Sequence, residues 1–70
     1  MPTGTIVKIV EDRGFGFVRQ DGQRHDTFFH FRDLHESIEF GPHLVEMRVT
    51  FEREEAPGGR VKAVDIRPEY

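Results

Sequence analysis

Short runs of β-branched and aromatic residues, separated by turn residues, constrain the fold of this chain more than any other feature. Several of the runs alternate apolar and polar residues, which is the pattern of strands with one buried face. Five strands are predicted in this way, over 5–11, 14–20, 24–31, 45–54 and 60–67. In the fourth predicted strand, alternation places four apolar residues on one face: Val45, Met47, Val49 and Phe51. Strands this short and this closely spaced are typical of a small sandwich or barrel.

The connections between these runs carry clear turn signals. An Asp-Gly pair at 21–22 closes the second run and predicts a hairpin, and a Pro-Gly-Gly turn at 57–59 separates the last two runs. The segment 32–43 is expected to be a loop. Leu34 and Ile38 lie four residues apart and allow one short helical turn there, but the Gly-Pro pair that follows stops anything longer.

At 70 residues, the chain is predicted to form one domain over 1–70. A chain of this size buries only about 60% of the surface that its unfolded form exposes. An open sheet would leave its edges unpaired and one of its faces uncovered. Closing the sheet into a barrel removes both problems, so we predict an all-β, five-stranded barrel filled by side chains.

The third run determines which aromatic side chains face water. Along 24–31, alternation puts Phe28 and His30 on one face and Phe29 and Phe31 on the other. Whichever face turns inward, at least one phenylalanine is left outside. The half-polar pair is the natural outward one, which exposes Phe28.

The second run, with Phe15 and Phe17 on one face, is ambiguous by itself. Burial statistics favour core aromatics by roughly two to one. The neighbouring run shifts the balance, because two adjacent strands that both expose rings make a stacking surface, with Val18 turned to the core. A set of core rings with scattered surface charges remains the alternative at this point.

Exposed rings beside cations are what single-stranded nucleic acid requires, since bases stack on the rings at roughly 1–3 kcal/mol each while cations neutralise the backbone. Gly14 and Gly16 fit this hypothesis, because they leave the neighbouring rings open to a ligand. The candidate charged or polar partners of the rings are Lys8, Arg13, His30, Arg60 and Lys62.

The net charge of −3 lowers the expectation of nucleic-acid binding without excluding it. Residues 1–32 carry five basic and four acidic groups, whereas 33–70 carry five basic and nine acidic ones. Exposed charges are screened beyond roughly 8–10 Å, so the local field at a site matters more than the total.

No catalytic, metal or cofactor site is expected. The chain has no cysteine, and its four histidines lack the regular spacing of metal ligands. No nucleophile or cleft accompanies the acidic cluster, so it is interpreted as a solvated hairpin tip that repels phosphate; its residues are Glu52, Glu54 and Glu55.

A cytoplasmic location without membrane association is expected. No apolar run approaches the roughly 18 residues of a membrane span. The N-terminal residues lack the basic start and long apolar core of a signal peptide.

Two motifs at specific spacing resemble the cold-shock domain family. "DRGFGFV" is similar to the first ribonucleoprotein motif of that family, and "DTFFHF" to the second, which there reads close to D-V-F-V-H-F. The similarity extends to "TGTIVK" and, more weakly, to "RVTFE" and "GGRVKAVDI", so it covers most of the chain.

Two other families that share parts of these motifs do not fit. The RNA-recognition motif has an aromatic residue where Gln20 stands, needs two helices, and carries its aromatic strands in the opposite order. The dinucleotide-binding fingerprint G-x-G-x-x-G fails because Arg19 stands at its last glycine.

The resemblance implies a five-stranded antiparallel oligonucleotide-binding (OB-fold) barrel that binds single-stranded RNA or DNA with little sequence preference. Carried over residue by residue, it implies a binding surface of Lys8, Phe15, Phe17, Phe28, His30 and Phe31.

The first strand departs from the family, whose binding surface there begins with a basic-Trp-Phe run. This chain has Lys8-Ile9-Val10, so the cation is kept and both rings are missing. Each missing ring removes roughly 1–3 kcal/mol of stacking, and Ile9 and Val10 are expected to give apolar contact to a base instead. The family also often has an aromatic residue in the loop after the third strand, for which the candidates are Phe40, His35 and His43.

The sequence is therefore compatible with two functions. The first is a monomeric, non-enzymatic protein that binds single-stranded RNA or DNA, acting as a cold-shock-like RNA chaperone or regulator of gene expression. The second is an interaction barrel whose aromatic face docks another protein, which an exposed apolar patch would also suit.

Overall fold

The computed structural model describes residues 2–69 and contains five strands. They are β1 (Thr3–Val10), β2 (Phe15–Gln20), β3 (Asp26–His30), β4 (Arg48–Ala56) and β5 (Arg60–Pro68). Three single 3₁₀ turns connect them: η1 (Glu11–Arg13), η2 (Phe31–Asp33) and η3 (Pro42–Leu44). The all-β prediction is confirmed, with strand ends that differ from the predicted ones by up to three residues. Within the described part of the chain, no helix is long and apolar enough to cross a membrane.

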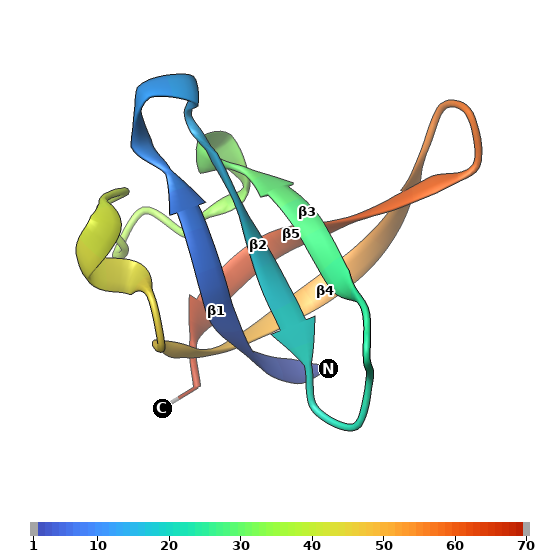
Figure 1. Ribbon diagram of the computed structural model, residues 1–70, viewed down its shortest axis with the longest axis horizontal. Helices are drawn as coiled ribbons and strands as arrows, with labels where there is room; N and C mark the ends of the chain where they lie inside the picture. The colour runs from blue at the N-terminus through green and yellow to red at the C-terminus, as the bar shows by residue number, and fades with distance from the viewer. Residues whose placement is uncertain (1, 70) are drawn as a thin grey trace.

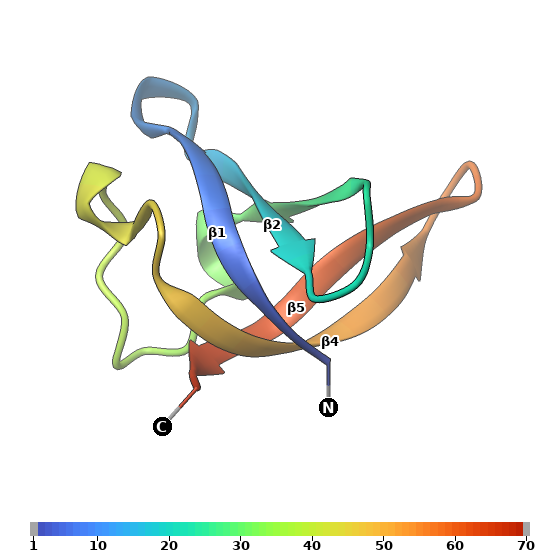
Figure 2. The same cartoon turned by 60° about the horizontal axis from the view of Figure 1, so that its bottom comes forward.

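The strands close into a barrel in the order β1-β2-β3-β5-β4, as Figures 1 and 2 show from two directions. All neighbours are antiparallel except β3 and β5, which are parallel and share the single partner pair Phe28–Lys62. The parallel contact follows from the strand order, because the chain crosses from β3 to the far side of β1 before β4 begins. The hairpin of β4 and β5 extends beyond the other strands.

The core is built from inward side chains of every strand and of the long loop. Val18 and Phe29 are fully buried, which confirms the predicted inward faces of β2 and β3. The predicted apolar face of the fourth strand is only partly right. Because β4 begins at Arg48, Val45 lies outside the strand with 42% of its surface exposed, while Met47 packs against the core. The buried hydrophobic residues are Ile6, Val18, Phe29, Ile38, Leu44, Val49, Phe51, Ala63 and Ile66.

The segment between β3 and β4 is a loop, as predicted, but its helical turns lie elsewhere. The 3₁₀ turns η2 and η3 stand at its two ends, and between Leu34 and Ile38 the chain forms a single hydrogen-bonded turn rather than a helix, with the Ile38 amide donating to the His35 carbonyl at 2.9 Å. Leu34 instead forms a parallel bridge with Ile66, and Ile38 is buried. The loop is therefore held to β5 and supplies part of the core.

Gly16 lies on the buried side of β2, opposite the rings of Phe15 and Phe17. A Cβ atom there would stand 2.6 Å from the Lys8 carbonyl oxygen and 2.8 Å from Cζ of Phe29. The expectation that Gly16 leaves the rings open to a ligand is therefore wrong. Its missing side chain makes room for Phe29 inside the barrel.

Arg48, at the start of β4, binds three other parts of the chain at the end of the barrel remote from η1. Its guanidinium donates to both carboxylate oxygens of Asp21 at 2.7 and 2.6 Å, to Glu69 at 2.9 Å and to the Thr5 hydroxyl at 3.1 Å. The hydrogen bond from Arg48, together with a second from Thr3, lowers the pKa of Asp21 from 3.8 to about 2. The hydrogen bonds to Asp21 and to Glu69 raise the pKa of Arg48.

Gly16→Ala is expected to lower the free energy of unfolding by about 1–3 kcal/mol, because the added methyl group overpacks the contact between β1 and Phe29. Urea unfolding followed by circular dichroism measures the change. A variant as stable as the wild type would contradict this expectation, because it would show that the barrel accommodates the added methyl group without strain.

Asp21→Asn is expected to lower the melting temperature near neutral pH. The folded pKa of Asp21, about 2, lies below its ordinary value of 3.8, so its carboxylate stabilises the fold above that ordinary value. This contribution is lost as the pH falls towards the folded pKa, so the variant and the wild type should converge there. Thermal unfolding over that pH range measures the difference, with Asp12→Asn as the control, since Asp12 has no ion-pair partner among residues 2–69. If the difference in melting temperature between Asp21→Asn and the wild type does not change with pH, the lowered pKa of Asp21 is contradicted.

Candidate nucleic-acid interface

The outer sides of β2 and β3 carry a continuous group of rings. In the antiparallel register, Phe15 lies opposite His30 and Phe17 lies opposite Phe28. The ring centroids of Phe15 and Phe17 are 5.4 and 6.1 Å from that of Phe28, and 5.8 Å from each other. These distances are those of interacting aromatic pairs. We call the aromatic face the set Phe15, Phe17, Phe28, His30 and Phe31.

The exposure of this face confirms the predicted outward direction of Phe28. Phe28 and Phe31 have 39% and 44% of their surface exposed, and the other three members are half-buried. A domain this small has few apolar side chains to spare for its surface. Rings left partly in water on this face therefore make it a candidate binding surface.

Phe31 reaches the aromatic face because β3 ends one residue before it. Strict alternation predicts that Phe31 shares the inward face of Phe29, and this is wrong: η2 begins at Phe31, and its ring centroid lies 4.5 Å from that of His30. The Phe31 amide donates to the Gly14 carbonyl at 2.9 Å. Gly14 has a φ of +75°, and a Cβ there would come within 3.0 Å of the Phe31 ring. Gly14 thus provides the space in which Phe31 lies.

Phe40 continues the row of rings, 6.0 Å from Phe31 between centroids. Of the three loop residues named as candidate aromatic partners, the structure places this one beside the face. The His35 ring is engaged within the loop, at 2.8 Å from the Ser37 hydroxyl.

A β-bulge in β1 determines what that strand presents beside the rings. The register shifts between Ile6 and Lys8, so that Lys8 lies opposite Phe17 and Val10 lies opposite Phe15. Ile9 packs against the core instead. The expectation that Ile9 gives apolar contact to a base is therefore wrong, whereas Lys8 and Val10 do flank the face.

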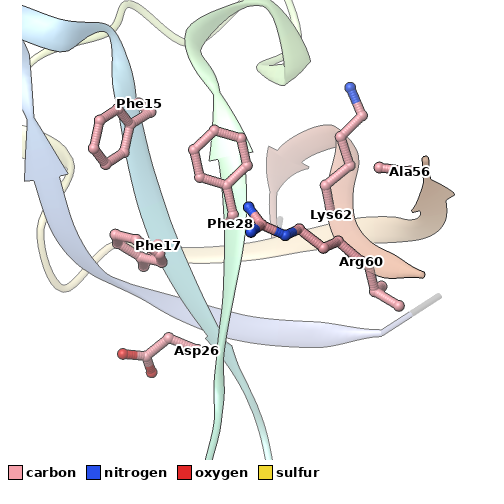
Figure 3. Close-up of a pocket in the computed structure, with 8 residues that line it drawn as sticks. Phe15, Phe17, Asp26, Phe28, Ala56, Arg60 and Lys62 are labelled. Carbon is pink, nitrogen blue, oxygen red and sulfur yellow. The ribbon is translucent and has the colours of Figure 1, made fainter. Parts of the chain in front are cut away.

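A groove of about 650 Å³ separates the rings from the start of β5. Figure 3 shows Phe15, Phe17 and Phe28 on one side and Arg60 and Lys62 on the other. Both cations named from the sequence therefore lie at the groove. The full lining is Phe15, Phe17, Asp26, Phe28, Ala56, Arg60, Val61 and Lys62.

The remaining charged groups fall into two sets. Arg13 is exposed at the end of η1, two residues before Phe15. Sequence reasoning missed Arg32, whose guanidinium carbon lies 5.8 Å from the Phe31 ring centroid, and Asp26, which lines the groove and pairs with Arg19 at 2.8 Å. Both residues could have been found from the sequence, because Asp26 lies within the motif "DTFFHF" and Arg32 directly follows it.

The acidic cluster of β4 lies along a solvated strand. Glu52, Glu54 and Glu55 are all exposed, and Glu54 is the register partner of Lys62 on β5. Among residues 2–69, no group of three or more histidine or acidic side chains is arranged to hold a metal ion.

Comparison with known proteins agrees with these features. Residues 2–68 match the family model of the "'Cold-shock' DNA-binding domain". The chain is also 44% identical over 57 residues to a protein named cold shock-like protein CspA from Shewanella violacea, an alignment that covers 81% of this chain and 80% of that protein. The family match spans all five strands, and the alignment with the relative covers most of the chain, rather than a short motif alone.

Phe28→Ala is expected to lower the free energy of unfolding by about 1–2 kcal/mol, because 39% of the surface of Phe28 already lies in water. Phe29→Ala, one residue further on, removes a fully buried ring and is expected to cost about 3–5 kcal/mol. Urea unfolding of the two variants measures the contrast. Equal losses would contradict the assignment of outward and inward faces.

Proposed function

The chain belongs to the cold-shock DNA-binding domain family, and from this membership we propose that it binds single-stranded nucleic acid by stacking bases on the aromatic face. The observation that carries the proposal is the cluster of Phe15, Phe17 and Phe28, which lies on the outer side of two adjacent strands and is bordered by cations. Every base has a flat π-surface, so stacking on such rings tolerates any sequence.

The rings and the cations around them have different roles in binding. The rings of Phe15, Phe17, Phe28 and Phe31 stack bases, and His30 extends the stacking edge next to Phe31. The sugar–phosphate backbone passes the cations at the margin of the face, where each contact releases a counterion. These cations are Lys8, Arg13, Arg60 and Lys62.

This mode of binding suits an RNA chaperone. Bases that stack on the protein cannot pair with one another, so bound RNA stays single-stranded. With no ring contributed by β1, affinity at each site is low, which lets ribosomes or polymerase displace the protein. We propose that the chain acts in this way as a monomeric, single-domain protein in the cytoplasm, without enzymatic activity. The family membership does not favour the alternative of a barrel that only docks proteins.

A titration of dye-labelled single-stranded oligonucleotides, RNA and DNA, tests the proposal. The label must be on the oligonucleotide because the chain has no tryptophan. Phe28→Ala is expected to lose about 1–3 kcal/mol of binding free energy, or roughly fivefold to 150-fold in affinity. Wild-type affinity should also fall with salt, with a slope of about −0.7 per phosphate neutralised.

Val45→Ala is the matched control, since Val45 is an apolar side chain of similar exposure outside the aromatic face. It should bind like the wild type. Unchanged affinity in Phe28→Ala, with the fold retained, would refute the stacking mechanism.

A further inference from the structure

One carboxylate, that of Asp33, lies behind the aromatic face and has no part in the binding described above. Its side chain is only 12% exposed, at the last position of η2. One oxygen, Oδ2, accepts a hydrogen bond from the His30 amide at 2.9 Å, and the other, Oδ1, lies 3.6 Å from Nζ of Lys62. A carboxylate this sheltered is costly unless it is paired, and both of its oxygens have a partner.

The hydrogen bond to His30 replaces a missing strand partner. The next amide along the chain, that of Phe31, donates towards β2 through the Gly14 carbonyl, so the His30 amide points the other way, towards β5. There, however, β3 and β5 pair only at Phe28–Lys62, two residues earlier. Asp33 supplies the acceptor that β5 does not.

The same residues close a reciprocal cap around the turn. While Asp33 accepts from the His30 amide, Nδ1 of His30 accepts from the Arg32 amide at 3.3 Å. This pair of bonds ends the strand at His30 and starts η2 at Phe31. The early end of β3 is what turns the Phe31 ring outward, next to His30, instead of inward beside Phe29.

The ion pair with Lys62 has the opposite effect on binding. Lys62 is the strand partner of Phe28 and lines the groove, so its ammonium is available to a phosphate only in competition with Asp33. The carboxylate therefore organises the rings through its hydrogen bond and weakens the local positive field through its charge. Replacing the carboxylate by an amide separates the two effects.

We propose that Asp33 is a positioning residue for nucleic-acid binding, which holds His30 and Phe31 in stacking geometry through its hydrogen bond to the His30 amide. The proposal rests on the function proposed above, because positioned rings matter only if bases stack on them. Asp33 itself touches no base or phosphate.

The test compares Asp33→Ala with Asp33→Asn in the same labelled-oligonucleotide titration. Alanine removes the acceptor, and affinity is expected to fall about fivefold to tenfold, a part of what a stacking position contributes. Asparagine keeps an acceptor for the His30 amide and releases Lys62. Its affinity is expected to equal or exceed that of the wild type, with a steeper dependence on salt.

Asp21→Ala controls for stability, since it breaks the ion pair with Arg48 beyond the far end of β2. It should lower the melting temperature and leave affinity unchanged. If it weakens binding as much as Asp33→Ala does, the effect of Asp33 is one of general stability, and the proposal is overturned.

A second measurement on the free protein does not depend on binding. The His30 and Phe31 rings are close enough to give a nuclear Overhauser contact, which should vanish in Asp33→Ala and persist in Asp33→Asn. The proposal is overturned if Asp33→Ala keeps the contact, or if Asp33→Asn loses as much contact and affinity as Asp33→Ala. If the wild-type protein binds no oligonucleotide, the proposed function fails on that result alone, and the ring contact still decides whether Asp33 positions the turn.

Discussion

The fit of the Phe29 ring against Gly16 determines the direction of every aromatic side chain on β2 and β3. These two residues are partners across the strands, and both are buried. Because the inward ring of β3 lies opposite a position that has no side chain, a one-residue slip of β3 would turn Phe29 to water, and a one-residue slip of β2 would turn Phe15 and Phe17 inward against Phe29. Phe15, Phe17 and Phe28 are then left on the outside, although their surface would otherwise contribute to a small core.

Regular alternation could be predicted from the sequence, and interruptions of it could not. The five strands, the inward Val18 and the outward Phe28 follow from period-two patterning, which is a local property. Two irregularities decide the rest: the bulge in β1, which turns Lys8 outward and Ile9 inward, and the early end of β3 at Phe31. The end of β3 depends on hydrogen bonds that the Gly14 carbonyl and the Asp33 carboxylate accept, and the bulge depends on pairing with β2, so neither is encoded in the strand that it alters.

Part of the negative charge near the aromatic face is compensated by ion pairs. Near that face, Asp26 pairs with Arg19 and Asp33 pairs with Lys62, so these carboxylates are largely compensated. Glu52, Glu54 and Glu55 lie on β4, on the other side of β5 from β3 in the barrel order, whereas the exposed Glu11 lies in η1 and the exposed Glu36 and Glu39 lie in the loop after η2. Screening reduces the influence of such exposed charges over a distance of roughly 8–10 Å. The total charge is therefore a poor guide to the potential that a ligand meets.

The composition of β1 sets the balance between stacking and electrostatics in binding. On the side of the rings it presents Lys8 and Val10, a cation and a branched apolar side chain, so stacking is confined to β2, β3 and the turn after β3. Stacking is insensitive to salt, whereas contacts with phosphate are not. When an aromatic face has fewer rings but the same number of cations beside it, contacts with phosphate supply a larger share of the binding free energy. Ionic strength, more than base identity, should therefore control how long this protein holds a strand.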